Sequence, residues 1–227
     1  MTVIINYLVQ DCEALLKAVT NNRAAMQSKG FDESSYLAFK TAKEELTAKE
    51  TAQQRAVKFA QSKTADQDTL IKEITAVIKM VQNAAKSAFG KDEQKLKLFK
   101  VKERIPTSVK GLRSLCEYVK EMVAEQNEIL LKNGLSQEDI DSLGLASSNL
   151  TTVDAEQENA KKLQVKATLT RDNAAANLKD QVFRVRNFAQ ACFAKNPAVL
   201  IEFEHITKGQ GGKRKGGDDT PPENPAQ

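Results

Sequence analysis

The sequence repeats itself, and this constrains the fold more than any other feature. A shift of 104 residues aligns 4–103 with 108–207 without a gap, and about one aligned position in five is identical. The identities are spread over the whole alignment, as a shared fold requires. We therefore expect two homologous helical units, 1–104 and 105–207, followed by a separate tail, 208–227.

The composition favours an all-α fold in which these units share a core. Aromatic residues make up 5% of the 227-residue chain, Trp is absent, and there are only ten Gly and five Pro residues. Such a composition is typical of long helices with narrow apolar stripes, which need a partner to cover them. Residues 1–104 carry an excess of basic side chains and 105–207 a slight excess of acidic ones. Opposite signs favour packing of unlike units, so we expect an elongated antiparallel bundle.

Each repeat begins with apolar residues spaced three and four apart, the pattern of one helix face. The spacing predicts a helix over 4–29 and its counterpart in the second repeat. In both, an amide side chain follows the apolar positions, Asn22 in the first and Gln126 in the second, where a polar residue can fix helix register. The matching apolar positions, which we call the repeat seam, are Leu8, Cys12, Val19, Leu112, Cys116 and Val123.

Glycines mark the ends of these first helices. Gly30 and Gly134 follow directly, and glycine can adopt the left-handed conformation that closes a helix. Asp32 and Ser136 are then expected to cap the next helix. Each repeat closes with a Phe, a turn and a short helix, for which Asn196 before Pro197 predicts a well-defined start. The Phe pairs of these segments are expected to plug the ends of the bundle.

The stretches 31–89 and 135–193 are each one very long helix or two helices joined near 64–68 and 168–172. Gly144 and the small polar run 146–149 indicate a short helix followed by a long one in the second repeat. We expect a similar break in the first repeat, near 35–43.

The tail has no large apolar residue and is expected to be disordered, because it cannot offset the entropy of ordering. Its cations have two readings. They either contact nucleic-acid phosphates or only solubilise the chain, since acidic residues follow at once. These cations are Lys208, Lys213, Arg214 and Lys215.

No catalytic, cofactor or metal site is predicted. Glu202 and His205 have the Glu-x-x-His spacing of di-iron bundles, but His205 is the only histidine, so a surface role is favoured. Cys12 and Cys116 occupy equivalent seam positions, where burial is favoured over a redox contact. Phosphate-binding loops and nucleophile motifs are absent, and we expect no enzyme and no small-molecule substrate.

The three cysteines, an odd number without a CxxC pair, indicate a reducing compartment. The sequence shows neither a signal peptide nor an apolar run long enough for a membrane span. A cytoplasmic location is therefore expected.

The residues that begin and end the helices form a pattern that resembles uncharacterised all-helical bacterial proteins built from a repeated unit. The features are a helix ending in Gly-Phe or Gly-Leu, an Ala-rich long helix with Thr and Asp four apart, and an apolar stripe ending in Phe before a short helix. The resemblance covers nearly all of 4–207. It implies an all-helical fold and a bacterial origin, and no activity or functional residue.

Two functional hypotheses follow. The first is a non-enzymatic structural or interaction protein that acts as a scaffold or spacer, binds a protein partner, or self-associates through its helix faces. The second is a nucleic-acid-associated protein that uses the tail and the more basic first unit without sequence preference. A third and weaker hypothesis is a redox-responsive bundle using Cys12 and Cys116.

Overall fold

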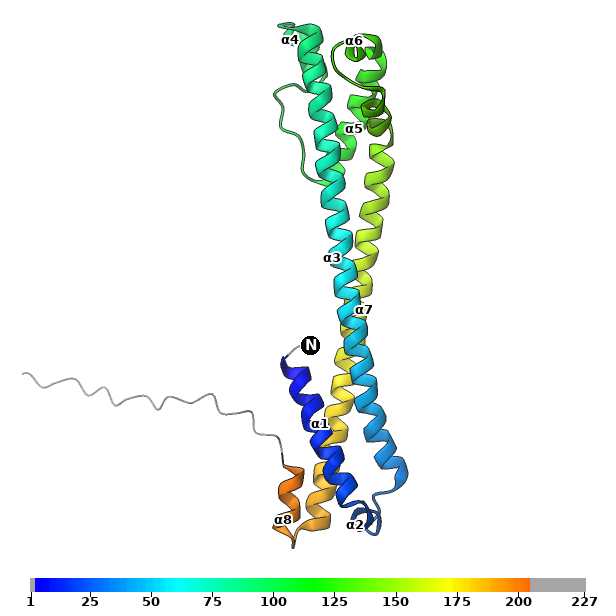
Figure 1. The fold of residues 1–227 in the computed structure, drawn as a ribbon, viewed down its shortest axis with the longest axis vertical. Helices are drawn as coiled ribbons and strands as arrows, with labels where there is room; N and C mark the ends of the chain where they lie inside the picture. The colour runs from blue at the N-terminus through cyan, green and yellow to red at the C-terminus, as the bar shows by residue number, and fades with distance from the viewer. Residues whose placement is uncertain (1–2, 205–227) are drawn as a thin grey trace, which may run out of the picture. The chain divides into compact units, whose positions relative to one another are not determined.

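A computed structural model describes residues 3–204, and the fold is all-α (Figure 1). Within that range there is no strand. The predicted fold class is therefore confirmed. The helices are α1 (Val3–Asn21), α2 (Arg23–Gln27), α3 (Glu33–Phe89), α4 (Glu93–Leu98), α5 (Val109–Glu125), α6 (Asn127–Leu131), α7 (Gln137–Phe193), α8 (Pro197–Leu200) and the 3-10 helix η1 (Ile201–Phe203).

The chain divides into two compact structural units, which we call unit 1 and unit 2. Their boundaries differ from those of the two sequence repeats. Unit 1 combines Met1–Leu46 with Ala175–Gln227, and unit 2 is Thr47–Ala174. Unit 1 therefore takes α1, α2 and the start of α3 from the first repeat, and the end of α7, α8 and η1 from the second. Unit 2 contains the rest of α3, α4, α5, α6 and most of α7 (Figure 1). Each unit thus completes its core with helices from both repeats.

The repeat is nevertheless preserved in the positions of the helices. Helices α2 and α6, and likewise α3 and α7, begin and end 104 residues apart. The terminal Phe pairs recur as well. The rings of Phe89 and Phe99 lie 5.8 Å apart at 17°, and those of Phe193 and Phe203 lie 5.8 Å apart at 26°. Both repeats therefore fold into the same succession of helices.

The predicted ends of α2 and α6 are confirmed. Gly30 and Gly134 have φ values of +102° and +99°, the left-handed region that a side chain disfavours. In each case the following N–H reaches back to close the helix, Phe31 N to Met26 O at 3.0 Å and Leu135 N to Leu130 O at 3.1 Å.

The caps of the long helices are also confirmed. The Asp32 carboxylate accepts from Ser35 N–H at 2.8 Å, and the Ser136 hydroxyl oxygen accepts from Asp139 N–H at 3.1 Å. Asn196 does lie at the N-cap position of α8, but its side chain forms no capping hydrogen bond.

The first helix of each repeat ends earlier than expected. A continuous helix over 4–29 was predicted, whereas α1 stops at Asn21 and α2 is a separate short helix. The break falls at Asn22, whose φ and ψ are −109° and 19°, and Gln126 has nearly the same values. Asn22 Nδ2 donates to Ala18 O at 3.0 Å and to Glu202 Oε2 at 3.2 Å. The amides therefore end a helix instead of fixing register within one.

Helices α3 and α7 are each continuous over 57 residues. The expected breaks near 35–43 and at 146–149 are wrong. Both segments keep buried apolar residues at helical spacing, which holds the helix against the core and outweighs weak local propensity. These residues are Phe39, Ala42 and Leu46 in α3 and Leu143, Ala146 and Leu150 in α7.

The two units each have their own apolar core. Of the repeat seam, Cys12 and Val19 are buried in unit 1, and Leu112, Cys116 and Val123 in unit 2, whereas Leu8 is half-buried. The core of unit 2 is built by Ile74, Ile78, Val81, Phe99, Leu112, Val119, Val123, Leu130, Leu143 and Leu150.

Candidate functional site

In unit 2 the interface between α3 and α7 is apolar along one part of the helices and polar along another. Glu50, at 1% exposure, is among the most buried side chains of the described chain, and Gln67 and Gln157 are also buried. These positions continue the three-and-four spacing of the apolar core residues. We call the six side chains Glu50, Thr64, Gln67, Asp154, Gln157 and Arg171 the polar seam.

The polar seam is itself duplicated. Arg171 Nη1 lies 3.8 Å from Glu50 Oε2, and Gln67 Nε2 donates to Asp154 Oδ1 at 2.9 Å. A shift of 104 residues converts one pair into the other, so each joins a carboxylate of one long helix to a donor on the other. Gln157 Nε2 adds a contact of 3.4 Å to Thr64 Oγ1. Buried pairs of this kind specify one antiparallel register and add less to stability than apolar contacts do.

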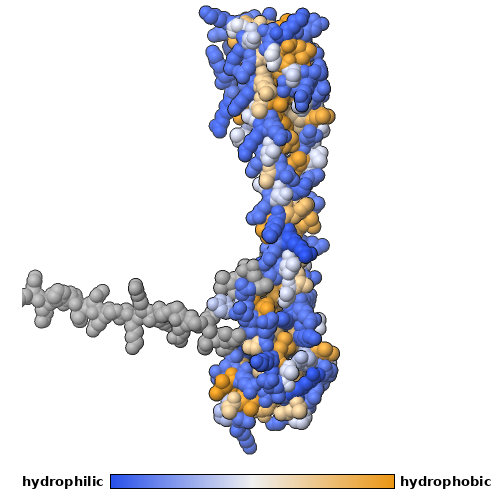
Figure 2. Space-filling model, viewed as in Figure 1, coloured by the Kyte–Doolittle hydropathy of each residue, from blue (hydrophilic) through white to orange (hydrophobic). Residues whose placement is uncertain are grey.

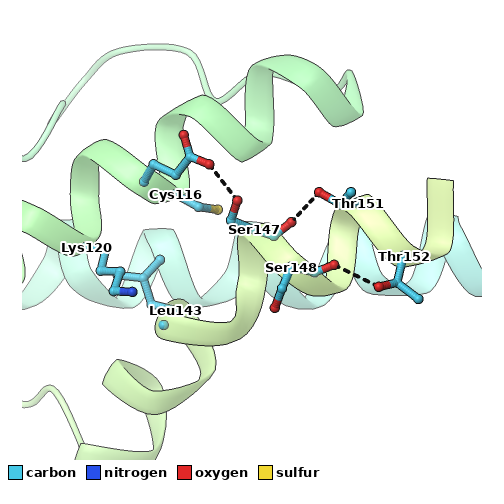
Figure 3. A pocket seen from close by; sticks show the side chains of 9 residues that line it. Cys116, Lys120, Leu143, Ser147, Ser148, Thr151 and Thr152 are labelled. Carbon is cyan, nitrogen blue, oxygen red and sulfur yellow. Dashed lines mark hydrogen bonds between the residues drawn. The ribbon is translucent and has the colours of Figure 1, made fainter. Parts of the chain in front are cut away.

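A second feature lies beside the polar seam, on α7 between positions 142 and 152. An open groove of about 520 Å³ separates this part of α7 from α5 (Figure 3). Leu143 and Cys116 form its apolar base, and a row of small hydroxyl side chains lines the α7 wall. The lining residues on α7 are Gly144, Ser147, Ser148, Thr151 and Thr152, and those on α5 include Glu117 and Lys120.

The hydroxyl groups of the groove are engaged within the protein. Ser147 Oγ donates to Glu117 Oε1 at 2.7 Å. Thr151 Oγ1 donates to Ser147 O at 2.9 Å and Thr152 Oγ1 to Ser148 O at 3.1 Å, as Figure 3 shows. The hydroxyl hydrogen atoms of the wall are therefore used within the protein, and Thr151 Oγ1 also accepts from Arg113 Nη1 at 3.3 Å. Burial raises the pKa of the Cys116 thiol to about 11, so this group stays protonated at neutral pH and is a poor nucleophile.

An apolar groove of about 330 Å³ lies on the other side of the same stretch, between α7 and α3. Its lining includes Leu70, Ile74 and Val77 of α3 together with Leu145 of α7. Leu145 is 59% exposed. Residues 142–152 therefore form an uncharged strip between two hollows, which Glu117 and Lys120 border from α5 and Glu73 borders from α3. We call this strip the small-residue face of α7.

The first repeat differs from the second at the positions that line the groove between α5 and α7. At the positions equivalent to Gly144, Ser147 and Ser148 it has Lys40, Lys43 and Glu44. There, in unit 1, Lys43 Nζ lies 2.8 Å from Glu13 Oε1, and Lys40 pairs with Glu44 at 3.9 Å. Lys43 thus reaches from α3 to α1 at the place where Ser147 leaves a groove between α7 and α5 in unit 2. The sequence predicts a helix break at 144–149, but this segment is helical and its small side chains leave a groove at the surface.

The predicted cysteine pair is divided between the units. Cys12 lies in the core of unit 1 and Cys116 in the core of unit 2, and both are free thiols. Burial raises the pKa of Cys12 to about 12. These thiols are shielded and protonated, which argues against the redox hypothesis.

The remaining predicted positions do not contribute to a described site. His205, Lys208, Lys213, Arg214 and Lys215 lie outside the described residues. Among the described ones, no group of three or more His, Cys, Asp or Glu side chains is arranged to hold a metal ion. Over residues 3–204, no helix is both long and apolar enough to span a membrane.

Comparison of the chain with protein-family models, curated proteins and solved structures finds no match. The all-helical architecture is therefore the part of the sequence resemblance that stands.

Proposed function

We propose that this protein is a non-enzymatic scaffold that binds another protein through the small-residue face of α7. The observation that carries the proposal is the groove between α5 and α7, which lies where the first repeat has charged side chains. A second groove flanks residues 142–152 on the side of α3. The duplicated halves have the same helices, so the difference between them points to a use of the second one.

The chemistry of this face suits a helical partner. Charged side chains are depleted from the cores of protein interfaces, and ridges of one helix pack into grooves of another. Ser147 and Gly144 allow a close approach of backbones, while Leu145 supplies exposed apolar area. The exposed hydroxyl oxygens of Ser148 and Thr152, which act as donors within α7, are placed to accept hydrogen bonds from a partner's polar side chains.

Self-association is the simplest form of this proposal, because the long helices of unit 2 leave further apolar side chains exposed. They are Phe59 on α3 and Leu163, Val165 and Leu169 on α7. A second copy of the chain would bury them together with the small-residue face. The free thiols fit a reducing, cytoplasmic setting for such a scaffold, and the resemblance to bacterial proteins fits a bacterial one.

The first repeat supplies the design of the test. The double variant Gly144→Lys/Ser147→Lys introduces the side chains of Lys40 and Lys43 into the second repeat. We expect it to fold, because Glu117 is positioned to pair with the new cation as Glu13 pairs with Lys43. Its side chains fill the α5–α7 groove. A control with the same added charge, Gln10→Lys/Ala14→Lys, changes exposed positions of α1, outside both grooves and on another helix than the exposed apolar residues of α7.

The readouts are the oligomeric state by sedimentation equilibrium and the proteins captured from host lysate by the immobilised full chain. We expect the wild type and the control to self-associate or to capture the same partner. In the groove variant, the affinity of self-association or the amount of captured partner should fall at least tenfold. The proposal fails if the wild type is a monomer that captures nothing, or if the groove variant behaves like the control.

A further inference from the structure

A different surface of unit 2 carries an independent inference. Helix α4 and the loop that follows it to Arg104 are rich in cations, most of them exposed. In Figure 2, the surface over α4, near the top of the view, is mostly hydrophilic. We call this set the α4 basic end: Lys91, Lys95, Lys97, Lys100, Lys102 and Arg104.

Only part of this charge is compensated within the protein. Lys95 Nζ lies 3.9 Å from the Asp92 carboxylate, and Lys100 Nζ lies 3.4 Å from Glu103 Oε1. Within the described part of the chain, the other four cations of the α4 basic end form no ion pair. Lys97 and Lys102 do share a hollow with the carboxylates Glu93 and Glu103. Cations still outnumber carboxylates over residues 91–104, so this surface has a net positive charge available to an external anion.

The backbone holds two of these lysines in an unfavourable conformation. Lys100 and Lys102 have φ values of +53° and +70°, in the left-handed region that normally favours glycine. Lys100 closes α4 as Gly30 and Gly134 close α2 and α6. Val101 N–H donates to Leu96 O at 3.1 Å, and the buried Gln82 side chain donates to Lys100 O at 2.8 Å.

The second repeat does not share this feature. The residues equivalent to Lys95, Lys97 and Lys100 are Val199, Ile201 and Glu204, and Glu204 has an ordinary extended conformation with φ of −68°. Lysine at this helix end strains the backbone, which glycine would not do, and only one of the two repeats has it. Backbone strain of this kind is often found at functional sites, which directs attention to the charge at this place.

We propose that the α4 basic end binds the phosphate backbone of a nucleic-acid duplex without reading its sequence. Lysines neutralise phosphates as flexible point charges and release counterions. Stacking on single-stranded bases needs exposed aromatic side chains, but Phe99 is buried and Lys100 lies over the Tyr118 ring at 5.2 Å. Insertion into a membrane surface needs a broad apolar helix face, and the six-residue α4 exposes only Leu98.

The test is the binding of a short fluorescent DNA duplex to the full chain, followed by anisotropy between about 50 and 200 mM salt. The triple variant Lys97→Gln/Lys102→Gln/Arg104→Gln removes uncompensated cations. We expect at least a tenfold loss of affinity at the low salt concentration. The slope of log affinity against log salt should fall by about 0.9 for each phosphate that the variant no longer neutralises.

Two full-chain controls locate the effect. Neutralising exposed lysines of α7, with Lys161→Gln/Lys162→Gln/Lys166→Gln, should leave affinity within about threefold of wild type, because salt screens charges that lie far from the bound duplex. A second variant neutralises the four cations between 208 and 215. If that variant alone abolishes binding, or if the α7 variant weakens it as much as the triple variant, the proposal is overturned.

A fourth variant separates binding from folding. Lys100→Gly should raise the melting temperature, because glycine relieves the left-handed strain, yet lower duplex affinity by severalfold through loss of a cation. Binding to anionic phosphatidylserine vesicles in place of the duplex would also overturn the proposal and assign the surface to membranes. This inference does not rest on the small-residue face of α7.

Discussion

The buried charge pair of the polar seam gives the sharpest stability prediction. Glu50 is 1% exposed, the Arg171 side chain is 13% exposed, and their closest charged atoms are 3.8 Å apart. At an effective dielectric constant of about 20, this separation corresponds to roughly 4 kcal/mol of gross attraction. Removing one member of a buried pair typically costs about 3–5 kcal/mol, because the remaining charge stays in the interior.

We expect Arg171→Ala to lower the free energy of unfolding by about 3 kcal/mol, the lower end of that range. Gln54 Nε2 still donates to Glu50 Oε1 at 3.1 Å after the substitution, which limits the destabilisation. The ion pair of Arg171 with the exposed Asp172 is removed as well, but this adds little, about 0–1 kcal/mol. The double variant Glu50→Leu/Arg171→Leu should be as stable as wild type, or more stable by about 1–4 kcal/mol, since it extends the apolar seam.

The assay is urea denaturation followed by far-ultraviolet circular dichroism, with midpoint and slope compared among variants. Lys161→Ala, which breaks a pair with Glu158 at the surface, is the matched control and should stay within about 0.5 kcal/mol. A cost below about 1 kcal/mol for Arg171→Ala would refute the reasoning. So would a double variant as unstable as the single one, because the polar pair would then contribute net stability.

The glycines and cysteines give two further predictions. Gly134→Ala should destabilise by about 1 kcal/mol, because φ is +99° there, whereas Gly144→Ala in the middle of α7 should stabilise by about 1 kcal/mol, with nothing within 4 Å of the new Cβ; equal signs in urea denaturation would contradict this. At pH 8, iodoacetamide should modify Cys12 and Cys116 at least tenfold more slowly in the native than in the unfolded protein, as read by mass spectrometry. Their pKa values are raised from 9.0, so the unfolded chain loses these protons first, and stability should fall as pH rises from about 9 toward 11 and 12. Rapid native alkylation, or stability that does not decline there, would show that the thiols are not buried.

Much of the local structure could be predicted from the sequence. The 104-residue repeat is visible in the sequence itself. The buried positions at Cys12 and Cys116 and the glycines that end α2 and α6 could be predicted because each depends on residues close by in the same helix. Helical periodicity and left-handed closure are local physical requirements, so the residue types reveal them. The same holds for the caps at Asp32 and Ser136.

The sequence indicates where the candidate site lies but not what structure it has. The small residues at 144 and 146–149 stand out in the sequence and predict a helix break that the structure does not have. Small side chains weaken a helix locally, but the buried Leu143 and Leu150 hold this segment against the core. Whether a small residue interrupts a helix or opens a groove depends on what packs across from it.

The tertiary structure alone decided which parts of the chain belong together. An apolar stripe shows which face of a helix is buried, but it carries no information on which other helix covers it. With two homologous repeats, the stripe of one helix could be covered equally well by the corresponding helix of the first or of the second repeat. The packing resolves it by joining the beginning of one repeat to the end of the other, so that Asp11 pairs with Arg186 at 2.7 Å and Glu50 with Arg171. The sequence by itself thus determined the helices and their ends, and packing between distant residues determined the units and the hollow face of α7.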